Sequence, residues 1–265
     1  MKSTLYKTIL LSLLCATGLA QSGESLSVPL SEPSAAGDLK IYNHSGTVDI
    51  IGYDGSTVEV EINARDDHDD WDSRPTRKGL KRIPNRALGV SITEEDNSVY
   101  IKSSNNNQKN YVIKVPRNFS LQVSTHHNGQ INVSNVKGSL ELNAHHGGIK
   151  VENVAGAVIA DTHHGEIKVT FTEIYDDFPM AFTTYHGDVD VSFPASINAD
   201  LKMKSAKGDI YTDFDFEVSS PEVEKSSTGR KKEIKVGGWT RGRVGSGGVD
   251  MLFDTYHGDV IIRKN

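Results

Sequence analysis

Histidine is concentrated in short phrases that end in glycine and recur along the sequence. Of the ten histidines in the 265-residue chain, six stand as adjacent pairs. These pairs are His126-His127, His145-His146 and His163-His164. Imidazole is a common ligand of Zn²⁺ and Cu²⁺, and it titrates near neutral pH. The chemistry to consider first is therefore metal binding or a response to protons.

Aligning the phrases on their glycines places the histidines in two columns. The first column holds His126, His145 and His163, with Tyr185 and Tyr256 in equivalent places. The second column holds His127, His146, His164, His186 and His257. Eight of the ten histidines belong to these columns, and all eight are candidate metal ligands.

Two interpretations of the columns stay open. Neutral imidazoles from successive repeats can share a Zn²⁺ or Cu²⁺ ion. A structural zinc site, however, uses four ligands at defined spacing, and the single cysteine, Cys15, lies far from the repeats. The other interpretation is a ladder in which ring packs on ring, and it is favoured because the aligned positions also accept Tyr, Lys and Ala. Protonated imidazoles repel one another in either case, so we expect stability or binding to change below about pH 6.5.

Short strands joined by glycine corners must position these histidines. A glycine recurs every nine residues from Gly129 to Gly165, and apolar residues follow two and four positions later, as Ile131 and Val133 do. Apolar residues two apart are typical of a strand, because successive side chains point to opposite faces. The glycine supplies the backbone angles of a tight corner. Each unit is therefore a short strand and a corner.

A longer period of about 18 residues contains two such units. Coils of this kind stack at strand spacing and bury each other's apolar faces. The sequence thus predicts an all-β, single-domain β-solenoid, similar to a parallel β-helix, with glycine corners. A β-sandwich also has short strands between turns, but it does not require the same side chains to return every 18 residues. Since a corner breaks the alternation of a strand, at least one histidine of each pair is expected to be exposed.

The N-terminus has the features of a secretory signal peptide over residues 1–20. Lys2 and Lys7 precede an apolar run, and Gly18-Leu19-Ala20 forms a small-x-small cleavage site. Lipid attachment at Cys15 is the alternative, but Leu14 stands where that processing prefers a small residue. We expect one domain over residues 21–265, with loop insertions near 65–86 and 219–233, where charged and polar residues interrupt the repeat.

Composition and motifs exclude several functions. The net charge is −6 without a basic cluster on a periodic segment, which argues against nucleic acid as a partner. No apolar run after residue 20 is long enough to span a bilayer. The sequence has no nucleophile elbow, phosphate loop or zinc-protease helix, so we expect no enzyme, with a polysaccharide-active β-helix enzyme as the minority alternative.

The segment from Tyr111 to Val169 resembles the bacterial adhesin-like β-strand-repeat family, a domain family of unknown function. The similarity lies in a strand ending in Val115-Pro116, the repeated Gly-x-Ile/Val-x-Val units, and the phrase Phe193-Pro194-Ala195-Ser196. The C-terminal Thr255-Tyr256-His257-Gly258-Asp259-Val260 belongs to the same pattern. The resemblance implies a single-domain β-solenoid of an exported or envelope-associated protein without an established catalytic activity. The histidine-rich corners of this chain differ from the family pattern, since members more often carry Asn or Ser at these positions.

These observations predict an exported, non-catalytic envelope protein that is periplasmic, associated with the outer membrane or extracellular. Its regular flank would act as an adhesin-like or scaffolding surface toward an envelope or extracellular protein or glycan. We expect no cofactor. The alternative is a module that binds Zn²⁺ or Cu²⁺ through the eight corner histidines.

Overall fold

The computed structural model describes residues 24–64, 88–104, 107–175, 178–219, 223–228, 231–236 and 238–265. Every regular element in these ranges is a strand, which confirms the predicted all-β class. Accordingly, no helix in the described part of the chain has the length and apolar character to cross a membrane. The expected signal peptide (1–20) and the expected insertion near 65–86 fall outside the described residues.

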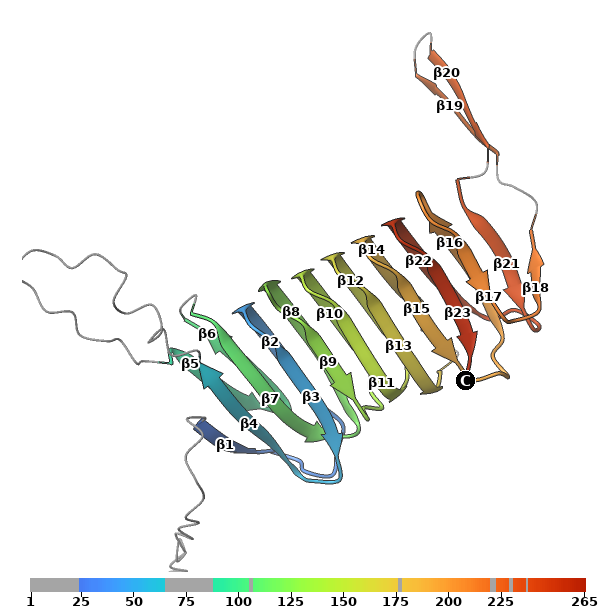
Figure 1. Ribbon diagram of the computed structural model, residues 1–265. Coiled ribbons are helices and arrows are strands. Elements are labelled where there is room, and N and C mark those ends of the chain that lie inside the picture. Colours follow the sequence, from blue (N-terminus) through green and yellow to red (C-terminus); the bar gives the residue numbers. More distant parts are fainter. Residues whose placement is uncertain are drawn as a thin grey trace, which may run out of the picture.

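Two large sheets extend along the same row of stacked coils, one on each side of the core (Figure 1). Sheet B contains, in spatial order and within the described residues, β5 (Val90–Glu95), β6 (Ser98–Ser103), β2 (Gly37–Ser45), β8 (Phe119–His127), β10 (Leu140–His146), β12 (Val158–His164), β14 (Met180–His186), β22 (Val249–His257), β16 (Ala199–Ser205), β21 (Thr240–Val244) and β18 (Phe216–Val218). Sheet A contains, over the same described ranges, β1 (Glu24–Pro29), β4 (Thr57–Ala64), β7 (Lys109–Pro116), β3 (Val48–Tyr53), β9 (Ile131–Ser134), β11 (Ile149–Ala155), β13 (Ile167–Glu173), β15 (Val189–Phe193), β23 (Val260–Lys264) and β17 (Ile210–Thr212).

Each coil consists of a strand of sheet B, a glycine corner and a strand of sheet A. The strands of successive coils are parallel and in register, so that Leu140 of β10 pairs with Val158 of β12, 18 positions later. The offset is 19 between β8 and β10, where Leu121 pairs with Leu140. It is 22 between β12 and β14, because Ala160 pairs with Phe182. The period of about 18 residues therefore describes the centre of the stack and lengthens beyond it.

The spatial order of the coils departs from chain order at both ends of the stack. From β8 to β15 each coil lies beside the next in sequence, but the coil β22–β23 then lies between β14–β15 and β16–β17. Likewise β2–β3 lies between β6–β7 and β8–β9. Our expectation that consecutive windings always lie on one another is wrong there. Side-chain matching gives the reason: Phe253 of β22 stacks on Phe182 of β14 with ring centroids 5.1 Å apart, whereas β16 has no aromatic residue to offer.

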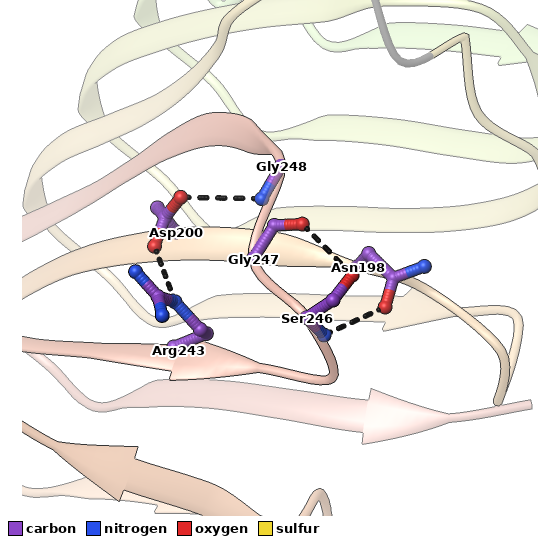
Figure 2. Close-up of polar contacts among 6 residues, drawn as sticks. All are labelled: Asn198, Asp200, Arg243, Ser246, Gly247 and Gly248. Atoms are coloured by element: carbon purple, nitrogen blue, oxygen red, sulfur yellow. Dashed lines mark hydrogen bonds and ion pairs between the residues drawn. The ribbon is translucent and has the colours of Figure 1, made fainter.

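Antiparallel strands close both ends of the parallel stack. β1 and β4 extend sheet A beyond β7, while β21 and β18 extend sheet B beyond β16. The turn from β21 to β22 is fixed by polar contacts (Figure 2): the Ser246 backbone N–H donates to Asn198 Oδ1 at 2.9 Å, and Asp200 accepts from the Gly248 N–H at 3.1 Å. Asp200 also forms an ion pair with Arg243 at 3.3 Å. This turn returns the chain to the inner side of β16.

The core lies between the two sheets and is built mainly by the alternation of inward and outward side chains along each strand. In β12 the side chains of Val158, Ala160 and Thr162 are buried, whereas Ile159 and Asp161 are exposed. Phenylalanines continue the alternation as stacked rows, with Phe171 and Phe193 rings 5.0 Å apart. Burying these inner faces removes large apolar areas from water and supplies the main stabilisation of the stack.

Residues 219–233, expected as a loop insertion, contain regular structure. β19 (Val223–Thr228) and β20 (Lys231–Val236) pair antiparallel and project away from the two large sheets (Figure 1). The projection agrees with an insertion between coils, but its backbone is a hairpin rather than an irregular loop.

Candidate functional site

Ring side chains form two ladders at the corner where the sheet B strands end. We call the first ladder column one; its rings, in spatial order, are His44, His126, His145, His163, Tyr185 and Tyr256. Column two contains His127, His146, His164, His186 and His257. All eight histidines considered as metal ligands lie in these columns, and the structure brings them together along one edge of the stack.

Rings in both columns are stacked nearly parallel. Centroid distances in column one are 5.8, 4.8, 5.3, 5.1 and 4.9 Å, with interplanar angles of 3–11°. In column two they are 5.9, 4.9, 5.0 and 4.8 Å, with angles of 8–19°. Parallel strand register fixes these distances, since it pairs His146 with His164 and His164 with His186. The ladders therefore repeat at the spacing of the strands themselves.

The two columns occupy different surfaces. His163 follows Ile159 and Asp161 at steps of two, so column one lies on the outer face of sheet B. His164 would face inward by simple alternation, but it is exposed because the chain turns at Gly165. This agrees with the expectation that the corner breaks the alternation and exposes a histidine of each pair.

A buried column of hydroxyls precedes the ladders and holds the corners. The Oγ1 of Thr162 donates to the carbonyl oxygen of Gly147 in the neighbouring coil at 2.8 Å. The same bond recurs from Thr184 to Gly165, from Thr255 to Gly187 and from Ser205 to Gly258 at 2.7–3.0 Å. Each hydroxyl thus links its own coil to the corner of the adjacent coil by a hydrogen bond. The bond holds the rings that follow in register.

Glycine is required at these corners by close contact between coils. Gly165 has φ of +152°, and a Cβ there would lie 2.5 Å from the carbonyl oxygen of Gly147. Carboxylates strengthen the same corners: Asp188 Oδ1 accepts from the Asp259 N–H at 2.8 Å, and Asp259 Oδ1 accepts from the Asp209 N–H at 2.8 Å. These aspartates accept hydrogen bonds from backbone groups of the adjacent coil.

Imidazoles within one coil are also in contact. The ring centroids of His126 and His127 are 4.2 Å apart at 81°, and those of His163 and His164 are 4.3 Å apart at 57°. In the latter pair the two Nδ1 atoms are 2.8 Å apart, so one ring donates an N–H hydrogen bond to the other. Nδ1 of His126 is buried without a hydrogen-bond partner in the described part of the chain.

The ladders disfavour protonation of their own members. Desolvation lowers the pKa of several imidazoles below 6.5, and repulsion from neighbouring imidazoles lowers it further. The residues whose pKa is lowered are His127, His145, His146 and His186. We therefore expect these four imidazoles to be neutral at neutral pH.

Sequence alignment of the corners missed two features. His44 belongs to column one, although its neighbour Ser45 puts no ring in column two. The sequence signal is Asn43-His44-Ser45-Gly46, a weaker copy of the phrases that end in glycine. A groove of about 460 Å³ lies on the outer face of sheet B, lined among others by Lys40, Gln122, Glu141, Ile159 and Phe178. Its strand residues stand four positions before the ring of column one on the same strand, but Phe178 comes from the segment before β14, where no repeat predicts its place.

The ladder geometry does not form a preorganised metal centre. In the described residues, no group of three or more His, Cys, Asp or Glu side chains is arranged to hold one ion. What the arrangement offers is a periodic line of hydrogen-bonding rings and, within single coils, pairs of imidazole nitrogens.

Comparison with known proteins finds one matching family model and distantly similar structures. No curated protein matches the sequence. A crystal structure from Clostridium sporogenes described as a "putative cell adhesion protein" has 12% identity, covers 92% of this chain and 99% of its own, and gives a TM-score of 0.38. A "putative adhesin" from Bacteroides fragilis has 9% identity, covers 93% of this chain and 98% of its own, and gives a TM-score of 0.30. Residues 124–237, the segment that carries most of both ladders, match the model of the Toastrack DUF4097 family.

Proposed function

We propose that this protein is an exported, non-catalytic, adhesin-like surface protein whose outer face of sheet B binds an extended glycan. In this proposal residues 21–265 act as a single β-solenoid domain. The observation that carries the proposal is column one, a line of exposed and half-buried rings that presents polar edges at regular intervals along six adjacent coils.

Column one suits hydrogen bonding better than ring stacking with a ligand. Its rings cover one another's faces, so the edges remain for contact. Those edges carry the phenolic hydroxyls of Tyr185 and Tyr256 and the ring nitrogens of the histidines, which both donate and accept hydrogen bonds. Sugar hydroxyls are partners of the same dual character.

The repeat of the ladder favours a glycan over a peptide. Neighbouring rings in column one are 4.8–5.8 Å apart, which is close to the advance of one sugar ring in an extended polysaccharide. An extended peptide presents side chains on one side only every two residues, or about 6.6–6.8 Å. Successive sugars could therefore repeat the same contact along the ladder, whereas a peptide would lose register after a few coils.

The groove supplies a second row of contacts on the same face. Gln122 Nε2 donates to Glu141 Oε2 at 3.2 Å, and both side chains are exposed beside the apolar Ile159 and Phe178. Exposed apolar groups beside amide and carboxylate groups match the mixed character of a sugar ring, which has apolar C–H faces and a polar rim. A concave site with a few converging polar groups is the usual form of a ligand site.

Titration with a panel of soluble bacterial envelope polysaccharides tests the proposal. We expect saturable binding that is weakened by Tyr185→Ala together with Tyr256→Ala. Tyr211→Ala is the matched control, because Tyr211 is also exposed but lies on β17 of sheet A. Equal loss in both variants, or binding confined to protein partners, would contradict the glycan assignment. The appearance of new reducing ends or unsaturated products during incubation would contradict the non-catalytic role.

A further inference from the structure

Three coils carry two imidazoles each, whereas the other ladder coils carry one. The double coils contain His126-His127, His145-His146 and His163-His164. The single coils have Ser45 beside His44, Tyr185 beside His186 and Tyr256 beside His257. Only in the double coils are two imidazoles from adjacent residues in contact, and in His163–His164 the two Nδ1 atoms are within hydrogen-bond distance of each other.

We propose that His163 and His164 bind Cu²⁺ through their Nδ1 atoms, as a two-histidine site completed by water. The two Nδ1 atoms already converge, at a separation of 2.8 Å. A metal ion would take the place of the proton that they share. Each ring stays neutral when the donor ring changes tautomer: its Nδ1 proton is released to solvent and Nε2 takes up a proton in exchange, so that both Nδ1 lone pairs face the ion.

The nitrogen separation distinguishes between candidate ions. Ligands at about 2.0 Å from a square-planar ion, at right angles, are about 2.8 Å apart, as the two nitrogens are here. Tetrahedral geometry around Zn²⁺ would need about 3.3–3.4 Å between them. Cu²⁺ also binds imidazole more strongly than the other divalent first-row ions do. Geometry and intrinsic affinity therefore both favour copper.

The surroundings of the pair leave room for such an ion. Both rings are exposed, so water can fill the remaining positions around copper. Asp161 lies two residues before His163 on the same outer face and interacts electrostatically with it, which favours a cation there. The stacked neighbours, His145 and His146 on one side and Tyr185 and His186 on the other, hold both rings in place.

Neighbouring pairs limit the number of ions. The rings of His145–His146 stack at 5.3 and 4.9 Å on those of His163–His164, so two dications in adjacent pairs would repel each other strongly. We therefore expect fewer copper ions than double coils, with His163–His164 filled first and adjacent pairs not filled together.

Calorimetric titration of the full chain with CuCl₂ near neutral pH, with electron paramagnetic resonance of the product, tests the site. We expect a saturable first step whose spectrum shows coupling to two nitrogens, with Zn²⁺ binding more weakly. The step is lost in His163→Ala/His164→Ala. It is retained in His44→Ala, which removes a ladder imidazole whose coil has no second histidine, and in His68→Ala, which removes a histidine that belongs to no glycine-ended phrase of the repeat.

His164→Ser keeps the test valid if the double variant fails to fold, because Ser45 occupies the aligned position beside His44 in β2. This variant is expected to lose the two-nitrogen spectrum while its thermal midpoint stays near that of the wild type. Absence of a saturable step in the wild type, or a first step of unchanged affinity in the folded His163 and His164 variants, would overturn the proposal. Neither result would bear on glycan binding, which is measured without metal.

Discussion

Removing one buried hydroxyl from the corner column should measurably destabilise the stack. Thr184 is 3% exposed, and its Oγ1 donates to the Gly165 carbonyl at 3.0 Å. Thr184→Val replaces this hydroxyl with a methyl group of similar size. An unpaired buried acceptor costs about 1–3 kcal/mol. The added methyl recovers at most about 0.8 kcal/mol by burial.

The net expectation is therefore a loss of about 1–2 kcal/mol. For a chain of this size that corresponds to a fall in the thermal midpoint of roughly 2–8 °C. Urea and thermal unfolding followed by circular dichroism would measure it. Thr183→Val is the control, because Thr183 is the adjacent residue on β14 but faces outward and is half-buried. Its effect should stay within about 0.5 kcal/mol.

A double-mutant cycle makes the reasoning sharper. Thr125 donates to the Gly129 carbonyl of its own coil at 2.7 Å, and the next coil has Ala144 in the hydroxyl position. Ala144→Thr should therefore add little to the wild type but restore much of the stability lost in Thr125→Val, since its hydroxyl would reach Gly129 as that of Thr162 reaches Gly147. Equal stability of Thr184→Val and Thr183→Val, or no coupling in this cycle, would show that water satisfies the corner carbonyls and would refute the argument.

Further predictions concern the corners, the core and pH. Gly165→Ala should destabilise the fold by more than about 1 kcal/mol in urea unfolding, because its φ and the nearby Gly147 carbonyl exclude a Cβ. Gly238→Ala is the control and should be neutral, since a Cβ at Gly238 would have no atom within 4 Å. Phe182→Ala should cost about 3–5 kcal/mol in the same assay, since it empties the stacked core beside Phe253, and a cost near that of a surface change would contradict the packing. Thermal midpoints should be highest above about pH 6.5 and fall as the pH drops below it, because the unfolded chain takes up protons near 6.5 while the folded imidazoles, with lowered pKa, resist them. The residues whose pKa is lowered are His127, His145, His146 and His186; replacing all four with Gln should flatten the profile, and a flat wild-type profile would contradict the prediction.

The repeat in the sequence predicts the local structure well because side-chain alternation and glycine corners are local constraints. Grouping the corners by their glycines pairs His145 with His163, and the parallel register has them stacked at 5.3 Å. The spatial order of the coils at the ends of the stack is not a local property of the sequence. Met251 pairs with Met180, 71 positions earlier, across a segment that forms another coil in between. A period cannot identify such a neighbour; matched Met and Phe side chains in β14 and β22 are the signal that could.

The candidate site was less predictable because its parts come from different levels of structure. The ring columns follow from the repeat, but the groove also needs Phe178, which belongs to no repeat unit. The hydroxyl column has a sequence signal in Thr162, Thr184 and Thr255, each of which precedes a ring residue. The sequence does not reveal that these hydroxyls join neighbouring coils, since their acceptors are carbonyl oxygens of another coil.

The coil that contains β16 shows which features the fold requires and which belong only to the surface. β16 follows the same parallel register against β22, and Ser205 repeats the corner hydrogen bond to Gly258 at 2.7 Å. Yet its ladder positions hold Ala206 and Lys207 instead of rings. Because this coil packs without them, the corner hydroxyl, the glycine contact and the apolar core are sufficient to build a coil. The imidazoles and tyrosines of the other coils are therefore an addition to the surface, and their chemistry is the part of the molecule that function has to explain.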